Sequence, residues 1–398
     1  MRTIRSLDLD GRRALVRVDF NVRLDRGAVA DDARIRAALP TLRYALERGA
    51  SCVLMAHLGR PHGKPDGHLE LDPVARRLSE LLPERYLRKC DEVVGPRARA
   101  MAEDLRPGQL LLLENLRFHR GEEANDEGFA AELAALGDLY VDDAFAACHR
   151  EHASIVGAPA RFAADARGGG LLLEREVDAL SSVRDAPEAP FVAVFGGAKV
   201  EDKLEAVGAL LDGADRVLVG GAMAMTFLAA RGRAVGRPKV ERDLLDTARG
   251  ILDRGGDKIL LPVDHAVAGD EGEGRRRTIA RGDVPSEATA LDIGPETIAR
   301  YEAEIERART VVWNGPMGKF EDESFRTGTR AVVDALARPG KTTVVGRGET
   351  GEAVRLLGKA EAMTHVSTGG GAFLTFLANG TLPGIEALEE ARGEDVCC

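Results

Sequence analysis

At 398 residues the chain is longer than one ordinary hydrophobic core supports, so two domains are expected. Hydrophobic residues make up 44% and charged residues 30% of the sequence, which excludes a disordered or fibrous chain. The net charge of −10 argues against a protein that coats nucleic acid, because that function needs a basic surface. No long apolar stretch suits a membrane helix, so we expect no membrane partner and a cytoplasmic location. We also expect a monomer that does not bind nucleic acid.

Short apolar runs that lead into helical patterns recur along the first half, which is typical of βα units with a parallel sheet. Ligands bind beyond the carboxyl ends of parallel strands, so the residues after each run are candidate site residues. The strands predicted in this half are Ala14–Phe20, Ser51–His57, Leu110–Glu114 and Leu139–Ala144.

An arginine follows each of these four strands, and guanidinium groups bind phosphate and carboxylate through paired hydrogen bonds. The pattern predicts a site for a small, highly anionic ligand. The alternative, that arginines only cover the surface, explains one of them more easily than four. His57 is either a ligand contact or a buried structural histidine. The four arginines are Arg34, Arg60, Arg117 and Arg150.

Three glycines followed by leucines at helical spacing predict that Gly168–Val183 is a helix between two lobes. The terminal segment follows turn-forming dipeptides, so it is expected to leave the second lobe and pack near the first. The predicted parts are a first lobe of residues 1–167, a linking helix of 168–184, a second lobe of 185–378 and the returning segment 379–398.

Glycine-rich loops follow most of the strands predicted in the second half. Glycine lets backbone N–H groups approach a ligand, and a following helix N-terminus favours phosphate. Tight turns alone explain one such loop more easily than five, so the second lobe is predicted to bind a nucleotide. The strands are Phe191–Phe195, Arg216–Val219, Lys258–Val263, Thr310–Trp313, Thr342–Val345 and Met363–Val366.

Lys199 and Lys203 are predicted to lie one turn apart on a helix, where two ammonium groups would neutralise a transferring phosphoryl group. The sequence contains no GxxxxGK[ST] loop. The spacing Gly346-x-Gly348-x-x-Gly351 matches the dinucleotide-binding pattern, but the next strand does not end in the acidic residue that holds a ribose. A dehydrogenase is therefore disfavoured.

Several stretches, in order from about residue 1 to 388, resemble signature sequences of the phosphoglycerate kinase family. The resemblance implies an α/β fold of two doubly wound, Rossmann-like parallel-sheet lobes, joined by a helix and separated by a deep cleft. The stretches are RVDFNV (Arg17–Val22), DDARIRAALPT (Asp31–Thr41), HLGRP (His57–Pro61), LLLENLRFH (Leu111–His119), GGAKVEDK (Gly196–Lys203), LDIGP (Leu291–Pro295), VVWNGPMG (Val311–Gly318) and STGGGA (Ser367–Ala372).

The implied reaction is reversible phosphoryl transfer from 1,3-bisphosphoglycerate to MgADP, which gives 3-phosphoglycerate and MgATP. The implied glycerate contacts are Asp19, Asn21, Arg34, His57, Arg60, Arg117 and Arg150. The implied nucleotide contacts are Gly197, Lys199, Gly221, Asn314, Pro316, Glu321 on the ribose, Gly346, Gly348, Glu349 and Thr350. Glu349 is also the candidate Mg²⁺ ligand. Candidate catalytic residues are Arg34, Lys199, Lys203 and Gly348, and lobe closure is expected about Gly168–Gly170 and the segment after Ser367.

One loop departs from the family pattern, since Gly346-Arg347-Gly348-Glu349-Thr350 stands where the family has GGGDT. Glu349 keeps a carboxylate with one more methylene, and Arg347 places a long cation where the family has glycine. The alternative function is therefore a divergent relative with weakened catalysis that acts as a ligand-binding or regulatory protein. Milder departures are Arg23, Asp142, Ala146, Glu201, Ala222 and Met225.

Overall fold

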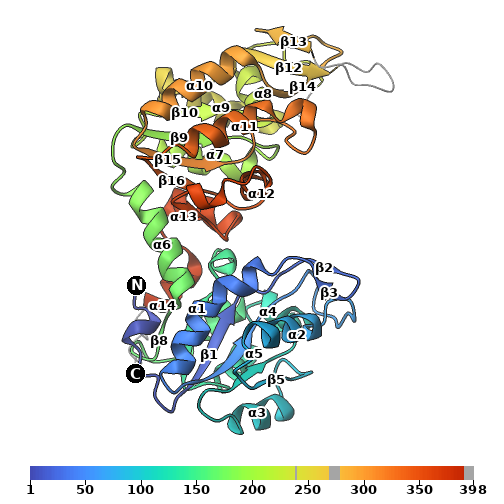
Figure 1. Cartoon of the computed structure of the whole chain (residues 1–398), viewed down its shortest axis with the longest axis vertical. Helices are drawn as coiled ribbons and strands as arrows, with labels where there is room; N and C mark the ends of the chain where they lie inside the picture. Colours follow the sequence, from blue (N-terminus) through green and yellow to red (C-terminus); the bar gives the residue numbers. More distant parts are fainter. Residues whose placement is uncertain (238–239, 269–277, 390–398) are drawn as a thin grey trace, which may run out of the picture. The chain divides into compact units, whose positions relative to one another are not determined.

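The computed structural model describes residues 1–237, 240–268 and 278–389, and in it the chain divides into two compact units (Figure 1). The first unit comprises Met1–Val177 together with the segment that begins at Thr381. The second unit comprises Asp178–Gly380. Each unit is built on its own six-stranded sheet.

All neighbouring strands of the first unit's sheet run parallel, in the order β5-β6-β4-β1-β7-β8. Its central strands are apolar and buried, as expected for a parallel sheet covered on both faces. A two-stranded hairpin, β2 (Leu24–Asp25) with β3 (Ala28–Val29), lies outside the sheet. The remaining elements are β1 (Arg13–Val18), β4 (Ser51–Met55), β5 (Leu87–Lys89), β6 (Leu110–Leu112), β7 (Leu139–Asp143), β8 (Arg167–Gly169), α1 (Ala33–Glu47), α2 (Asp72–Leu81), α3 (Pro96–Glu103), α4 (Arg120–Glu123), α5 (Glu127–Ala134) and α14 (Pro383–Glu389).

The second unit has a parallel sheet in the order β11-β10-β9-β15-β16-β17 and a separate antiparallel sheet in the order β13-β12-β14. Trp313 and the surrounding valines are fully buried in the core of the parallel sheet. The elements are β9 (Phe191–Phe195), β10 (Arg216–Val219), β11 (Ile259–Leu260), β12 (Asp264–Ala268), β13 (Thr278–Arg281), β14 (Thr289–Ile293), β15 (Thr310–Asn314), β16 (Thr342–Val345), β17 (His365–Val366), α7 (Glu201–Leu210), α8 (Met223–Ala230), α9 (Leu245–Gly255), α10 (Pro295–Arg307), α11 (Thr327–Leu336), α12 (Glu349–Leu356) and α13 (Gly371–Asn379).

The two parallel sheets confirm the predicted α/β fold class, while several element bounds needed correction. The four strands predicted in the first half end one or two residues early, where the chain turns into the loops at the sheet edge. Lys258–Val263 shortens to β11, since Pro262 lacks the N–H that a ladder requires. Met363–Val366 shortens to β17 because a helical turn precedes it. Neither β5, β8 nor the antiparallel sheet was predicted.

The helix that joins the units, α6, spans Leu171–Arg184, so the predicted start at Gly168 was wrong. Gly168 and Gly169 belong to β8 instead. The carboxylate of Asp143, at the end of β7, fixes the start of α6. Its Oδ1 accepts hydrogen bonds from the backbone N–H groups of Leu172 at 2.9 Å and Leu173 at 3.3 Å. This cap satisfies donors that a helix N-terminus otherwise leaves unpaired.

The acidity of Asp143 predicts a pH-dependent stability. Burial raises the pKa of Asp143 to about 7. A carboxyl group with a raised pKa in the folded state keeps a proton that the unfolded chain releases, so stability falls as pH rises from about 4 to about 7. Asp143→Asn keeps the accepting oxygen and cannot ionise. Between pH 5 and pH 8 we expect the unfolding free energy of the wild type to fall, relative to that of Asp143→Asn, by on the order of 3 kcal/mol.

Urea denaturation across that pH range measures the difference. Asp165→Asn is the matched control, because Asp165 is an exposed carboxylate of the same unit. Parallel curves for Asp143→Asn and the wild type would contradict the prediction.

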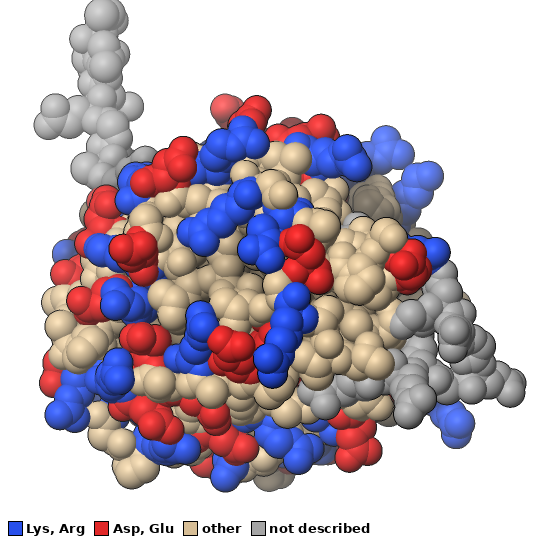
Figure 2. All heavy atoms as spheres, turned by 90° about the horizontal axis from the view of Figure 1, so that it is seen from above, with Lys and Arg blue, Asp and Glu red and all other residues tan. Residues whose placement is uncertain are grey.

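The segment after Thr381 belongs to the first unit, where the backbone N–H of Gly384 donates to the carbonyl of Cys148 at 2.9 Å. Cys397 and Cys398 lie outside the described residues. Within the described ranges, no helix combines the length and the apolarity needed to cross a membrane. On the face in Figure 2, Lys and Arg side chains alternate with Asp and Glu side chains. The cytoplasmic location and monomeric state remain predictions.

Candidate active site

The first unit gathers polar and charged side chains at one edge of its sheet. Strands β1, β4, β6 and β7 are parallel, so the loops that follow them meet at the same edge. Asp19 follows β1, His57 follows β4 and Arg117 follows β6. Arg34, in the first turn of α1, forms an ion pair with the carboxylate of Asp19. The sheet therefore brings residues far apart in the sequence into one cluster.

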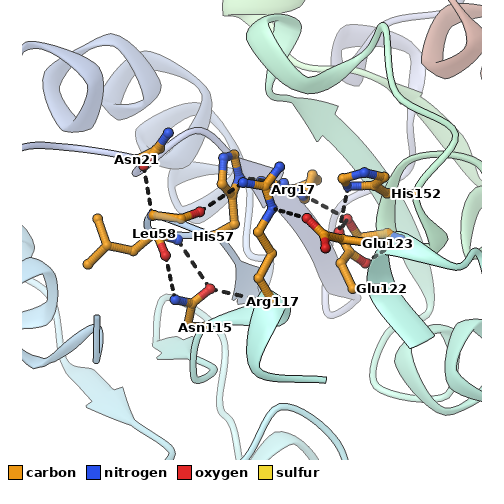
Figure 3. Close-up of polar contacts among 11 residues, drawn as sticks. Arg17, Asn21, His57, Leu58, Asn115, Arg117, Glu122, Glu123 and His152 are labelled. Carbon is orange, nitrogen blue, oxygen red and sulfur yellow. Dashed lines mark hydrogen bonds and ion pairs between the residues drawn. The ribbon is translucent and has the colours of Figure 1, made fainter. Parts of the chain in front are cut away.

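Side-chain hydrogen bonds tie these loops together (Figure 3). Asn21 Oδ1 accepts from the backbone N–H of Gly59 at 3.0 Å, and Arg117 Nη1 donates to the carbonyl of Gly59 at 2.8 Å. The amide of Asn115 bonds to both backbone groups of Leu58, accepting at 3.1 Å and donating at 2.7 Å. These bonds hold the loops after β1, β4 and β6 in fixed register, which preorganises the cluster.

Arg17, which was not among the predicted site residues, lies at the centre of the cluster. It is 1% exposed, and its Nη2 lies 2.9 Å from Nδ1 of His57. Its Nε donates to Ser154 Oγ at 2.9 Å, and Ser154 in turn donates to Glu122 at 2.6 Å. A signal was available, since a charge inside the apolar run Ala14–Phe20 requires buried partners.

Burial and crowded positive charge keep the histidines of this edge neutral. Burial is the main cause that lowers the pKa of His57 well below its ordinary value, and the charges of Arg17, Arg117 and Arg34 lower it further. Burial is also the main cause that lowers the pKa of His149 to about 4 and that of His152 to about 4. Because they are neutral, the histidines add no further charge to the repulsion among the arginines. The positive potential that remains suits an anionic ligand.

The predicted acid-binding residues divide into two groups. Asp19, Asn21, Arg34, His57 and Arg117 form the cluster just described. Arg150 is exposed in the turn after β7, where its charge adds to burial, the main cause, in lowering the pKa of Arg117 and of His149. Arg60 is exposed on the loop after β4 and takes no part in the hydrogen bonds of the cluster.

The second unit contains a cavity of about 370 Å³ beside the carboxyl ends of its parallel strands. Its walls are mostly apolar, with carboxylates at a few places. Ala222 and Met225, two of the departures from the family pattern, lie in these walls, as does His265, which was not predicted. The lining includes Gly197, Gly221, Ala290, Leu291, Pro316, Met317, Glu321 and Glu349.

Two glycines with left-handed backbone conformations shape the mouth of this cavity. Gly197 has φ +82° and donates its N–H to the carbonyl of Pro316 at 2.7 Å. Gly221 has φ +61° and donates to the carbonyl of Met317 at 2.9 Å. A Cβ on Gly221 would lie 2.5 Å from the backbone nitrogen of Gly197, so only glycine lets these loops approach.

The start of α12 places Glu349 and Thr350 beside the same loops. Glu349 lines the cavity, and Thr350 Oγ1 accepts a hydrogen bond from the N–H of Gly315 at 2.6 Å. Gly348, with φ +83°, immediately precedes the helix. Gly346 lies so close to Asn314 that a Cβ would overlap the Asn314 amide. The predicted nucleotide residues Asn314, Gly346, Gly348, Glu349 and Thr350 are thus neighbours.

The two lysines lie in this region, but not as predicted. Helix α7 begins at Glu201, so Lys199 precedes the helix and is exposed. Lys203 lies in the first turn of α7, and its Nζ donates to the carbonyl of Lys199 at 2.9 Å. A Cβ on Gly197 would be 3.4 Å from Lys203 Nζ and 3.7 Å from Glu349 Oε2, which places both charged groups at the glycine loop.

The chain is thus an α/β protein with a cationic strand-end site in one parallel-sheet unit and a glycine-lined cavity in the other. The family model described as phosphoglycerate kinase matches residues 4–380. A phosphoglycerate kinase of Rubrobacter xylanophilus is 51% identical over 390 residues, covering 98% of both chains. One of Moorella thermoacetica is 49% identical over 392 residues, covering 98% of this chain and 99% of the relative. The chain therefore belongs to the phosphoglycerate kinase family.

Solved structures agree with this membership. The phosphoglycerate kinase of Coxiella burnetii is similar with a TM-score of 0.86 at 38% identity, covering 97% of this chain and 98% of that one. That of Pyrococcus horikoshii has a TM-score of 0.86 at 34% identity, covering 98% of both chains.

Proposed function

We propose that this chain catalyses reversible phosphoryl transfer from 1,3-bisphosphoglycerate to MgADP, with 3-phosphoglycerate and MgATP as products, in glycolysis and gluconeogenesis. The observation that carries the proposal is the contrast between its two sites. One is a cluster of arginines and neutral histidines suited to a small anion, and the other is a largely apolar cavity edged by glycine loops, suited to a nucleotide.

The acid is proposed to bind in the first unit. Its phosphate and carboxylate would pair with the guanidinium groups of Arg117, Arg60 and Arg150, while Asp19 and Asn21 hold the loops and accept from hydroxyl groups. The acceptor carboxylate is already ionised near neutral pH, so the reaction needs no general base. Catalysis then consists of alignment and of charge stabilisation on the transferring phosphoryl group.

The nucleotide is proposed to bind in the second unit. The apolar walls of the cavity suit a purine base, and the carboxylate of Glu321 suits the two hydroxyl groups of a ribose. Gly197, Gly221 and Gly348 would let the backbone of their loops approach the phosphates, because they carry no side chain. Arg34, Lys199 and Lys203 would supply the cations that balance charge as the phosphoryl group moves.

Mg²⁺ would enter with the nucleotide. Among the described residues, no three or more His, Cys, Asp or Glu side chains form a metal cage. Glu349 is one of the carboxylates that line the cavity, and a single protein ligand of this kind fits an ion held mainly by phosphate oxygens and water. The ion, when bound, would neutralise part of the phosphate charge, and Lys203 beside Glu349 would neutralise more.

The test is direct. Purified protein is mixed with MgATP and 3-phosphoglycerate, and formation of the acyl phosphate is followed by a coupled assay. Turnover supports the proposal. Thermal stabilisation by both ligands without turnover would instead support the ligand-binding alternative, which the comparisons do not favour.

Because acid and nucleotide are assigned to different units, we propose that the units close on each other when both ligands bind, excluding water from a reactive acyl phosphate. Gly168–Gly170 and the segment after Ser367 are the proposed hinges. We expect small-angle scattering to report a smaller radius of gyration with both ligands than with neither. An unchanged radius, with both ligands shown to be bound, would contradict closure.

The altered loop is proposed to weaken nucleotide use modestly. Arg347 is a long cation where close backbone approach is expected, and Glu349 extends the carboxylate by one methylene. The double variant Arg347→Gly with Glu349→Asp should therefore raise kcat/KM for MgADP. A fall in kcat on the order of a thousandfold would instead show that Arg347 acts like an arginine finger. Glu352→Asp, in the same helix and exposed, is the matched control.

A further inference from the structure

The contact between Arg17 and His57 determines which ring nitrogen of His57 carries the proton. Arg17 Nη2 lies 2.9 Å from His57 Nδ1, and both side chains are buried. A guanidinium group has hydrogen-bond donors and no acceptor, and it stays protonated at every accessible pH. Nδ1 of His57 must therefore accept, so it carries no proton. The single proton of the neutral ring then lies on Nε2.

The guanidinium of Arg17 is itself held by a chain of buried contacts (Figure 3). Its Nη1 donates to the carbonyl of Val18 at 2.6 Å, and its Nε donates to Ser154 Oγ at 2.9 Å. The hydroxyl of Ser154 donates to Glu122 Oε1 at 2.6 Å, and the backbone N–H of Ser154 donates to Glu122 Oε2 at 3.0 Å. Glu122 and Ser154 are both 0% exposed. The contacts leave Arg17 little freedom to turn towards a ligand.

The charges around His57 oppose a second proton on its ring. Burial is the main cause of the lowered pKa of His57, and four neighbouring groups act in the same direction. They are Arg17 on β1, Arg117 after β6, Arg34 on α1 and His152 after β7. Protonation of Nδ1 would also turn its contact with Arg17 into a repulsion between two donors. His57 therefore stays neutral through the range in which an ordinary histidine titrates.

We infer that Arg17 is a positioning residue that holds His57 in the tautomer with its proton on Nε2, so that a neutral N–H donor is offered to the acid substrate. The inference rests on the proposed binding of the acid in the first unit. Such a donor binds an anion without adding a further charge to the arginine cluster, and its strength does not change between pH 6 and pH 8.

The tautomer can be read directly from the wild-type protein. In long-range ¹H–¹⁵N spectra of the full-length ¹⁵N-labelled protein, the His57 signals are assigned by their loss in His57→Gln. We expect a pyridine-like Nδ1 and a pyrrole-like Nε2 that do not shift between pH 5.5 and pH 8. A pyrrole-like Nδ1, or a ring that titrates near pH 6.5, would overturn the inference. This measurement needs no catalytic activity, so its failure is distinct from failure of the proposed function.

A variant tests the consequence for binding. Arg17→Gln removes a charge that opposes protonation and frees the ring to exchange its proton between both nitrogens. We expect the KM for 3-phosphoglycerate to rise about twofold at pH 7.5, because only the fraction of rings with the proton on Nε2, about half, offers the donor. The rise should be smaller at pH 6, because a protonated ring again carries a proton on Nε2.

The KM for MgATP should stay unchanged in Arg17→Gln, which separates a local effect from partial unfolding. A KM for 3-phosphoglycerate that rises equally at both pH values would overturn the positioning role. If Arg17→Gln does not fold, the wild-type spectrum still decides, and Ser154→Ala provides a milder variant. Ser154→Ala removes one anchor of Arg17 while retaining its charge, so a smaller rise in KM with a neutral His57 is expected.

Discussion

Replacing Arg34 with alanine should lower kcat by about a hundredfold or more, while the KM for 3-phosphoglycerate changes much less. Loss of one preorganised donor to a transition state typically has an effect of this size. Arg34 is suited to that role because the carboxylate of Asp19 holds its guanidinium at the edge where the acid is proposed to bind. Arg117, which is more buried and bonded to Gly59, would carry the ground-state binding.

Steady-state kinetics of Arg34→Ala, with each substrate varied in turn, separate the two roles. Arg36→Ala is the matched control, since Arg36 lies on the same helix and pairs with Asp32 at 2.9 Å at an exposed position. If Arg34→Ala raises the KM and leaves kcat intact, Arg34 only holds the substrate.

Substitution of Gly221 by alanine should damage the second unit and its nucleotide site together. The alanine would adopt φ +61° and press its Cβ on the backbone of Gly197 and on the carbonyl of Pro316. Backbone groups cannot move aside as a flexible side chain does, so we expect a loss of stability of about 2–4 kcal/mol. The separated loops should also raise the KM for MgATP by more than about tenfold, which is about 1.4 kcal/mol of binding.

Denaturation and kinetics of Gly221→Ala test both effects, with Gly213→Ala as the control. Gly213 lies in the same unit, has no left-handed backbone, and would place its Cβ in open space. Equal behaviour of the two variants would show that the close approach of the glycine loops is unimportant.

Strands of the parallel sheets could be predicted from the sequence because strands buried on both faces appear as apolar runs bounded by turn residues. Phe191–Phe195, Arg216–Val219 and Thr342–Val345 match the structure residue for residue. Strands β13 and β14 could not be found in this way, since exposed and half-buried residues predominate in them. The start of α6 was also out of reach, because the carboxylate that caps it comes from β7.

In the candidate site, too, some residues could be predicted from the sequence and others could not. Side chains at the carboxyl end of a strand or just beyond it, such as Asn314 and His57, could be placed from their position in the pattern. Arg17 was not selected, because it lies within a strand rather than after one, although a charge inside an apolar run was the available signal. Lys199 was predicted to lie on a helix, but the helix after β9 starts at Glu201. Nothing in the local sequence distinguishes a start at Glu201 from a start at Lys199.

The position of α14 has a consequence for the order in which the protein is completed during synthesis. Translation releases Asp178–Gly380, the entire second unit, before the residues that finish the first unit. Until α14 emerges, the surface at Cys148 and Ile155 lacks the cover of Gly384, which packs closely against both residues. The half of the molecule that is made first is thus finished last, and a nascent chain halted near residue 380 would present that uncovered surface to chaperones and to other chains.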